Sequence, residues 1–269
     1  MLLKNKTALV TGSSRGIGLG VAKAFLEQGA RVVLSSERPR DQIPDAEEVL
    51  RHEGVFYLQA DMTRDGEPQR LVREAWERLK GIDILVNNVG TFREPPLLDI
   101  RKEHFDFIFN LNVWASLAAS IEFVRLARSS SQGKKILFTT SLNATRSEPG
   151  HVLYDPSKGA INAMTRQLAI ELAPLGISVM AIAPGLIETP LTDFGLRSDP
   201  VARQAIIEQI PLRCIGTIEE IAPWYVFLAS DLAKYATGTI IPIDGGLDAQ
   251  QMPTRPIGSG ERHAAEGEV

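Results

Sequence analysis

Short apolar runs alternate with longer amphipathic stretches along most of this chain. The short runs are rich in Val, Ile and Leu and end at glycine or polar residues, which predicts buried β-strands. They occupy residues 6–11, 31–35, 55–60, 82–86, 135–140, 177–183 and 239–243. The longer stretches have apolar residues at helical spacing and cover residues 19–28, 65–80, 101–128, 154–173 and 217–230.

Three other segments have weaker patterns. Residues 39–53 are polar and are expected to be partly helical, and residues 186–211 are expected to be a mobile segment around one short helix. Thr217 and Glu220 have the spacing of a capping box at the start of the last helix. Residues 248–269 are rich in Pro, Gly and charge, so a disordered tail is expected after a single domain that covers residues 1–247.

Strands that alternate with helices of this length predict an α/β fold with a parallel sheet and helices on both faces. Ligands of such sheets bind at the carboxyl ends of the strands. Polar or glycine-rich segments follow several of the predicted strands, and they should therefore converge on one crevice. These segments are residues 12–18, Asp61, residues 88–90, Ser141 and residues 184–185.

The composition is typical of a soluble globular protein, with 44% hydrophobic and 23% charged residues in 269. A net charge of −4 gives no overall attraction to nucleic acid or to an anionic membrane, so neither is an expected partner. The single Cys214 cannot form an intramolecular disulfide, and we find no signal-like segment and no run of about 18 apolar residues. We therefore expect a cytoplasmic protein. The sequence suggests no metal-binding cluster.

A glycine-rich turn joins the first predicted strand to the first predicted helix. Its spacing, Gly12-x-x-x-Gly16-x-Gly18, lets the backbone approach a pyrophosphate whose charge the helix N-terminus stabilises. The spacing differs from the common G-x-G-x-x-G motif. A turn without a ligand is the alternative, but the flanking strand and helix favour cofactor binding.

A serine, a tyrosine and a lysine form the candidate catalytic group. Tyr154 and Lys158 are four residues apart and would share one face of a helix. A phenol titrates near ~10, and a nearby ammonium lowers that pKa. Ser141 follows the fifth predicted strand and could hydrogen-bond a carbonyl or alcohol oxygen. Tyr-x-x-x-Lys alone is more often an ordinary helix surface, but the three residues together suggest acid/base chemistry on a carbonyl–alcohol pair.

In combination, these motifs resemble those of the short-chain dehydrogenase/reductase family, in its common branch of about 250 residues. The resemblance covers roughly residues 4–247. It implies a Rossmann-type doubly wound sheet, a nicotinamide cofactor, NAD(P)(H), a small carbonyl or alcohol substrate, and a homotetramer or homodimer. The matching segments are residues 11–18 (TGSSRGIG), Asp61, residues 87–90 (NNVG), Asn112, Ser141, Tyr154 with Lys158, residues 184–185 and residues 244–246.

The resemblance also implies a role for each matching residue. Tyr154 would donate the proton in reduction and take it in oxidation, Lys158 would lower the tyrosine pKa, and Ser141 would hold the substrate oxygen. Lys158 would also bond the nicotinamide ribose. Asn112, by itself interpreted as a core amide, would keep a water in a proton relay with Lys158. Tyr154 would also contact the cofactor. The remaining cofactor contacts would be Gly12, Ser14, Arg15, Gly16, Ile17 and Gly18 at the pyrophosphate and ribose side, Ser36, Glu37 and Arg38 at the adenosine ribose, Asp61 and Met62 at the adenine, Asn88 and Gly90 at the adenosine ribose and the middle of the cofactor, and Pro184, Gly185, Ile187 and Thr189 at the nicotinamide.

The chain departs from the family pattern in two places. Val89 stands where the family usually has alanine, which could narrow the edge of the pocket. After the second strand, NAD-using relatives usually have aspartate at Ser36, and NADP-using relatives often have arginine at Glu37. Arg15 resembles the NADP pattern and Arg38 could reach a phosphate, whereas Glu37 would repel one. The balance slightly favours NADP(H).

Substrate contacts are expected from the loops after the fourth and fifth strands and from residues 186–211, which would close over the nicotinamide. Asn143 and His151 are candidates beside Ser141 and Tyr154. Further candidates are Thr91, Phe92, Arg93, Leu142, Arg146, Leu186, Phe194 and Leu196. Arg93, Arg146 and His151 would suit an acidic or polyhydroxy substrate. The alternative, that they are solvated residues at the rim of the site without a role in binding, is at least as well supported. A sugar, a hydroxy acid and a 3-oxoacyl thioester all stay open.

A catalytically silent scaffold or cofactor sensor is the alternative function, because a fold does not imply an activity. A scaffold has no need for Asn112, Ser141, Tyr154 and Lys158 together, so the complete set favours an enzyme. A dehydratase or epimerase with bound NAD is less favoured, because such relatives usually have a larger C-terminal substrate region.

Overall fold

A parallel sheet is the centre of the molecule. The computed structural model describes residues 1–190, 192 and 199–251. Within these residues, seven strands pair in parallel in the order β3-β2-β1-β4-β5-β6-β7. All the predicted strands are confirmed, with ends that shift by two residues at most. They are β1 (Thr7–Val10), β2 (Arg31–Ser36), β3 (Val55–Gln59), β4 (Ile84–Asn87), β5 (Lys135–Thr139), β6 (Ser178–Pro184) and β7 (Ile240–Ile243).

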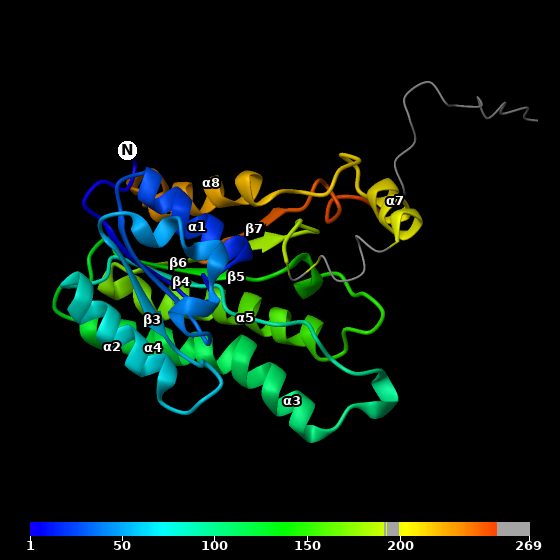
Figure 1. Cartoon of the computed structure of the whole chain (residues 1–269), viewed down its shortest axis with the longest axis horizontal. Helices are drawn as coiled ribbons and strands as arrows, with labels where there is room; N and C mark the ends of the chain where they lie inside the picture. The colour runs from blue at the N-terminus through cyan, green and yellow to red at the C-terminus, as the bar shows by residue number, and fades with distance from the viewer. Residues whose placement is uncertain (191, 193–198, 252–269) are drawn as a thin grey trace, which may run out of the picture.

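Helices cover both faces of the sheet (Figure 1), as the alternating pattern predicts. α1 (Gly16–Glu27) and α8 (Ile218–Ala229) pack together on one face. α2 (Glu67–Leu79), α4 (Ala115–Ala127) and α5 (Tyr154–Leu172) cover the other. Because both faces are buried, the central strands are continuous apolar runs. The α/β fold class, with a doubly wound parallel sheet, is therefore confirmed.

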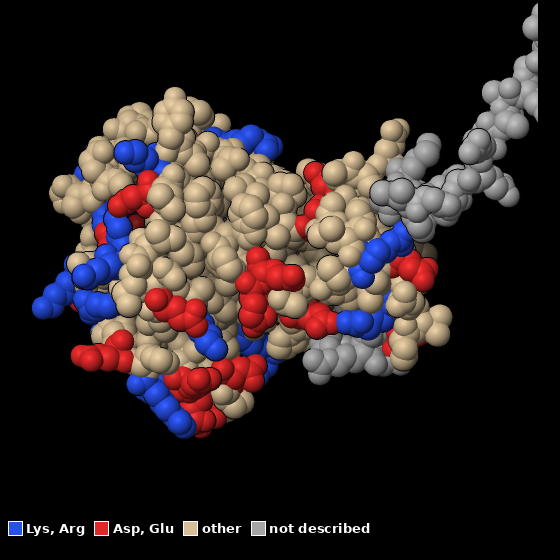
Figure 2. Space-filling view, turned by 90° about the horizontal axis from the view of Figure 1, so that it is seen from above, with Lys and Arg blue, Asp and Glu red and all other residues tan. Residues whose placement is uncertain are grey.

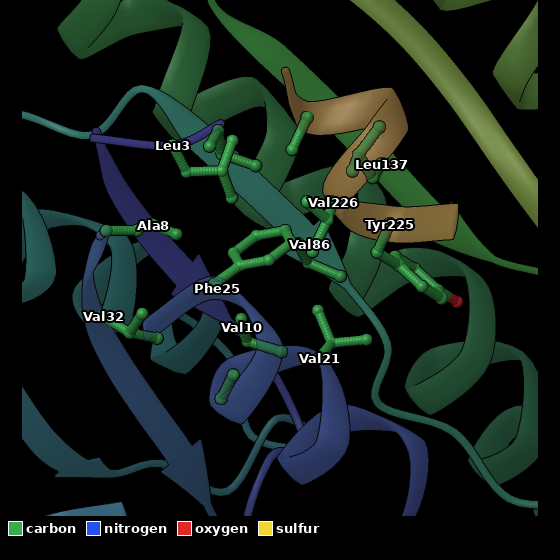
Figure 3. Close-up of a cluster of buried hydrophobic side chains, with 14 of the residues drawn as sticks. Leu3, Ala8, Val10, Val21, Phe25, Val32, Val86, Leu137, Tyr225 and Val226 are labelled. Carbon is green, nitrogen blue, oxygen red and sulfur yellow. The ribbon is translucent and has the colours of Figure 1, made fainter. Parts of the chain in front are cut away.

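The core consists of a hydrophobic cluster on each side of the sheet. On the α1 side, aromatic and branched side chains from two helices pack over the strands (Figure 3). The labelled residues of that cluster include Val21, Phe25, Tyr225, Val226, Val10, Val86 and Leu137. On the other side, Leu71 of α2 and Phe123 of α4 belong to the second cluster. Burial of each such large side chain contributes about 2 kcal/mol, and the two layers hold the strand ends from which the site loops extend.

The remaining helical elements are short. α7 (Pro200–Gln209) is the helix expected within residues 186–211. The predicted capping box of α8 is confirmed, because the Thr217 amide donates to Glu220 Oε2 at 2.8 Å. The single-turn elements are η1 (Arg40–Gln42), η2 (Pro44–Ala46), η3 (Val49–Arg51), η4 (Leu97–Asp99), η6 (Leu142–Ala144), η7 (Ala173–Leu175) and η8 (Asp231–Ala233).

The predicted helix over residues 101–128 contains a change of helical type. It consists of α3 (Lys102–Phe109), a π-helical turn η5 (Asn110–Trp114) and α4. The whole run, Lys102–Ala127, is long and apolar enough to cross a membrane by length and composition, but half of its most apolar window is buried inside the fold. Ala119 and Phe123 pack in the core beneath the sheet. The run is therefore interpreted as a core helix.

Two predicted features reach beyond the described residues. Phe194 and Leu196 lie outside them, as do residues 252–269 of the expected disordered tail. The segment just after the predicted boundary at residue 247 is still attached to the domain. Arg146 Nε donates to Asp248 Oδ1 at 3.3 Å, and Gln250 Nε2 donates to the Gln209 carbonyl at 2.7 Å.

The surface has mixed charge on the face drawn in Figure 2. Basic and acidic side chains are interspersed there, with uncharged area between them. This arrangement agrees with the small net charge of −4.

Candidate active site

The carboxyl ends of the central strands bring the predicted cofactor residues together. Asn88 follows β4, and its Nδ2 donates to the carbonyls of Thr11 at 3.1 Å and Gly12 at 3.0 Å. Its Oδ1 accepts from Thr139 Oγ1, at the end of β5, at 3.1 Å. Asn88 thus fixes the glycine turn against two neighbouring strands. Val89, where the family usually has alanine, packs directly against Gly12.

The glycine turn has the geometry of a phosphate cradle. Gly12 and Gly16 have φ angles of +61° and +59°, which favour glycine. A Cβ on Gly18 would lie 2.5 Å from both Asn88 Nδ2 and the Gly12 carbonyl oxygen. Within the described residues, the N-terminus of α1 has neither a side-chain cap nor an acidic residue in its first turn. Its amides and dipole therefore suit a pyrophosphate.

Three other predicted residues lie on this turn. Ser14 is buried, the Ile17 side chain packs against the core, and Arg15 is the exposed N-cap residue of α1. Within the part of the chain that the structure describes, the Arg15 guanidinium has no hydrogen-bond or ion-pair partner. It is thus available to an anionic ligand.

The predicted adenosine side of the site lies at the ends of β2 and β3. Ser36 is buried, and its hydroxyl lies 2.9 Å from the Tyr57 hydroxyl. Glu37 Oε1 lies 3.6 Å from Arg38 Nε, so the acidic charge that would repel a phosphate is partly offset. Burial raises the pKa of Tyr57, which keeps its phenol protonated as a hydrogen-bond donor.

Asp61 and Met62 follow β3 and differ in exposure. A short hydrogen bond from Thr63 Oγ1 to Asp61 Oδ1, at 2.6 Å, lowers the pKa of Asp61, and Arg64 Nε lies 3.1 Å from Oδ2. Met62 is buried in the core beside the sheet. An adenine contact by Met62 would therefore use its backbone.

The predicted nicotinamide side of the site follows β6. A Cβ on Gly185 would lie 2.7 Å from Asp244 Cα, so the Pro184–Gly185 and Asp244–Gly246 segments touch. Ile187 is buried, and its carbonyl accepts from Thr192 Oγ1 at 2.6 Å. Thr189 lies 3.7 Å from the position of a Cβ on Gly16, which brings this loop over the glycine turn.

Tyr154 and Lys158 lie on adjacent turns of α5, as predicted. Lys158 Nζ is 5.7 Å from the centre of the Tyr154 ring and donates to the Thr139 carbonyl at 2.9 Å. Burial lowers the pKa of Lys158 to about 8. Burial also raises the pKa of Tyr154 to about 12, although its hydrogen bond with Ser141 acts in the opposite direction. Near neutral pH the phenol is protonated and the lysine is charged.

The expected lowering of the Tyr154 pKa is therefore wrong for the protein without ligands. Loss of water around the phenol raises the pKa more than the hydrogen bond with Ser141 lowers it. The negative charges of Asp155 and Glu148 raise the pKa further. A protonated phenol suits the donor role in reduction.

The predicted substrate residues gather around Tyr154. The Asn143 amide donates to Ser141 Oγ at 3.1 Å, and its side-chain Nδ2 lies 3.3 Å from His151 Nδ1. The His151 ring meets the Tyr154 ring edge-on, with centroids 5.4 Å apart. Asp155, which the sequence did not single out, holds the group because Asn143 Nδ2 donates to its Oδ1 at 3.0 Å.

Asn112 is buried in the π-helical turn and its side chain is fully engaged. Its Oδ1 accepts from the Thr91 amide at 2.9 Å, and its Nδ2 donates to the Thr91 carbonyl and to Ser157 Oγ, both at 2.9 Å. A Cβ on Gly90 would lie 3.2 Å from Asn112 Oδ1 and 3.6 Å from Lys158 Nζ. The three residues are therefore neighbours, and the relay water stays a prediction.

A cavity of about 520 Å³ adjoins this group between the loops after β4 and β5 and the start of α5. Its lining includes Asn143 and His151 but not Ser141, Tyr154 or Lys158. Of the described residues that line it, three are acidic, Glu94, Glu148 and Asp155, and only His151 is basic.

Arg146 does not line the cavity. Its guanidinium bonds the Asp248 side chain and the carbonyls of Asp248 and Gln250. No group of His, Cys, Asp or Glu among the described residues could hold a metal ion.

Known proteins are similar to this chain in sequence and in fold. A family model described as enoyl-(acyl carrier protein) reductase matches residues 12–248. The 3-oxoacyl-[acyl-carrier-protein] reductase FabG of Staphylococcus epidermidis is 33% identical over 245 residues, covering 90% of this chain and 99% of that protein. The chain belongs to the short-chain dehydrogenase/reductase family.

Other members of the family point to the same chemistry. Glucose 1-dehydrogenase of Gluconobacter oxydans is 34% identical over 244 residues, covering 90% of this chain and 91% of that protein. The Pseudomonas aeruginosa RhlG/NADP active-site complex superposes with a TM-score of 0.85 at 31% identity, covering 91% of this chain and 97% of that one. The protein is therefore an NAD(P)-dependent short-chain dehydrogenase/reductase, an oxidoreductase that transfers hydride between a nicotinamide cofactor and a carbonyl or alcohol.

Proposed function

We propose that Tyr154 is the general acid/base of this oxidoreductase, with Ser141 and Lys158 as its partners. The observation that carries the proposal is the half-buried Tyr154 phenol, which is hydrogen-bonded to Ser141 and has Lys158 Nζ 5.7 Å from its ring centre. Ser141 and Tyr154 would both hydrogen-bond the substrate oxygen. In reduction, the Tyr154 hydroxyl gives its proton to that oxygen, and the Lys158 charge stabilises the phenolate left behind. The Thr139 carbonyl orients Lys158 for this task.

The bound nicotinamide supplies the hydride in reduction and accepts it in oxidation. The glycine turn and the N-terminus of α1 would hold its pyrophosphate. We further propose a preference for NADP(H). Arg15 is available to bind the extra phosphate, and Arg38 partly offsets the negative charge of Glu37, which would otherwise repel that phosphate.

Replacing Tyr154 by Phe tests the acid/base role. Turnover should fall at least ~1,000-fold, because the acid/base group is lost, while the dissociation constant for NADPH, measured by fluorescence titration, should stay within about twofold. Near-wild-type turnover would remove the proposed mechanism. Failure of the wild-type protein to bind either NADPH or NADH would instead favour the scaffold alternative.

We propose an uncharged polyhydroxy compound as the substrate. Glu94, Glu148 and Asp155 give the adjoining cavity a negative field, and Arg146 is engaged by the C-terminal segment. A sugar can hydrogen-bond these groups, whereas an anion would be repelled. Assays with D-glucose, D-gluconate and, in the reductive direction, acetoacetyl-CoA should give the highest kcat/KM for glucose. Preference for acetoacetyl-CoA would contradict this assignment and favour a 3-oxoacyl thioester.

We also propose a cytoplasmic homo-oligomer without nucleic-acid or membrane partners. The mixed surface charge and the unpaired Cys214 support this location. Apolar side chains exposed on α4 and α5 support self-association.

A further inference from the structure

A carboxylate from the loop after β4 caps the helix that carries Tyr154. The Leu153 amide donates to Glu94 Oε1 at 3.1 Å and to Oε2 at 3.0 Å, and the Tyr154 amide donates to Oε2 at 2.8 Å. Leu153 is the N-cap residue of α5, and its apolar side chain cannot cap the helix. Glu94 therefore supplies from a distant loop what a local Ser or Asp usually supplies.

The same loop also touches the catalytic side chains. The Phe92 ring meets the Tyr154 ring edge-on at 6.1 Å and lies 5.7 Å from the His151 ring. Both backbone groups of Thr91 are bonded to Asn112. The first residues after β4 thus hold Tyr154 at its ring and, through Glu94, at its backbone.

Charge makes the Glu94 contact stronger than an ordinary cap. A carboxylate bonded to amide groups forms charge-assisted hydrogen bonds, and its negative charge opposes the positive end of the helix dipole. The three bonds come from the N-cap residue and the first residue of α5, so they fix the point from which the phenol projects. Displacement of a reacting group by about 1 Å can cost about 100-fold in rate.

We propose that Glu94 is a positioning residue that holds the backbone of Tyr154 in register with Ser141 and Lys158. The inference rests on the proposed function, since it assigns importance to the exact location of the Tyr154 hydroxyl. Glu94 acts through Tyr154 and is separate from the glycine turn that would bind the cofactor.

The test compares Glu94→Ala, Glu94→Gln and Glu148→Gln in the full-length protein. Glu94→Ala removes both acceptors, and Glu94→Gln keeps one carbonyl oxygen in place. Glu148→Gln removes an equal charge from the same cavity, but Glu148 does not bond the amides of α5 through its side chain. Hydrogen exchange followed by mass spectrometry reports the amides of Leu153 and Tyr154 without any substrate.

In Glu94→Ala, exchange at Leu153 and Tyr154 should be at least about tenfold faster, with residues 12–18 unchanged. With the best substrate found above, kcat should fall at least about tenfold, and the NADPH dissociation constant should stay within about twofold. Glu94→Gln should recover most of both losses, and Glu148→Gln should leave exchange unchanged.

Unchanged exchange and unchanged kcat in Glu94→Ala would overturn the inference. Equal losses of kcat in Glu94→Ala and Glu94→Gln, together with loss of NADPH binding, would also overturn it, because that result indicates general destabilisation. High activity in Tyr154→Phe would instead remove the proposed function, whatever the exchange at residues 153–154. The two failures are therefore distinguishable.

Discussion

At the scale of single residues, the burial of the charged Lys158 side chain lowers the stability of the folded protein. Its pKa is about 8 in the folded protein against an ordinary 10.5. The folded state therefore binds the proton less tightly than the unfolded state. The penalty is complete below pH 8 and is relieved as the pH rises from about 8 to about 10.5. At pH 7 it is on the order of 3 kcal/mol.

Lys158→Met should therefore stabilise the protein without cofactor at pH 7 while it reduces activity. Loss of the hydrogen bond to the Thr139 carbonyl offsets about 1 kcal/mol. A net gain of about 1–2 kcal/mol corresponds to a rise of a few degrees in Tm. Calorimetry at pH 7 and pH 10 should show this gain shrinking at the higher pH. A lower Tm than wild type at pH 7 would contradict the inferred charge penalty.

The cofactor preference is also decided by single residues. Arg15→Gln and Arg38→Gln should each weaken NADPH binding by about tenfold, because each removes a charge-assisted contact to the extra phosphate. NADH binding should change by less than about twofold. Arg40→Gln is the control, because Arg40 is exposed in the next turn, η1. Equal losses for NADPH and NADH in fluorescence titrations would exclude phosphate recognition by these arginines.

Site residues differ in how far the sequence could reveal them. Tyr154 and Lys158 were predictable from their four-residue spacing on a helix, and Ser141 from its position after a strand. The structure brings the three residues together. Glu94 acts on the backbone amide of Tyr154, and Asp155 acts on the side chain of Asn143. Both contacts join segments that are separated in the sequence and meet only in the folded chain. The spacing of residues along the chain therefore could not reveal them. The direction of the Tyr154 pKa shift was also missed, because burial is a property of the fold.

At the scale of elements, the positions of the strands along the chain follow from local patterns, whereas helical irregularity does not. Each strand is a compact run of branched apolar residues, and the Thr217–Glu220 capping box is a local pattern, so both were predictable. The π-helical turn Asn110–Trp114 was not predictable, because the apolar residues keep an ordinary helical spacing through it. Such turns are frequent at functional sites, and this one holds Asn112.

The strand–turn–helix element at the N-terminus allows a direct test of the cofactor cradle. Gly18→Ala would place a Cβ 2.5 Å from the Gly12 carbonyl, which is backbone and cannot rotate away. We expect a loss of about 1–3 kcal/mol in stability and at least about tenfold weaker NADPH binding. Gly159→Ala in α5 is the control, because its Cβ would meet the nearest atom at 3.8 Å. That variant should be neutral or slightly stabilising. Unchanged NADPH affinity in Gly18→Ala would argue against the cradle.

At the scale of the whole molecule, the outward sides of α4 and α5, and the end of η5 that leads into α4, bear apolar side chains that the fold leaves in water. Trp114 is 47% exposed, Ile121 is 37% exposed and Ile170 is 73% exposed. Trp114 and Ile121 are seven residues apart, two helical turns, so they lie on one side of the run. The other side of that run packs in the core beneath the sheet. A second copy of the chain that covers these residues would complete their burial.

Self-association through this surface predicts a native mass of at least twice 29.5 kDa. The double substitution of Ile121 and Ile170 by Glu would place carboxylates in the interface, where their desolvation strongly opposes association. Sedimentation equilibrium should then give a smaller species with unchanged circular dichroism. Val201→Glu is the matched control, because Val201 is apolar and 80% exposed but lies on α7. A monomeric wild type, or equal dissociation in the control, would rule out an interface at α4 and α5.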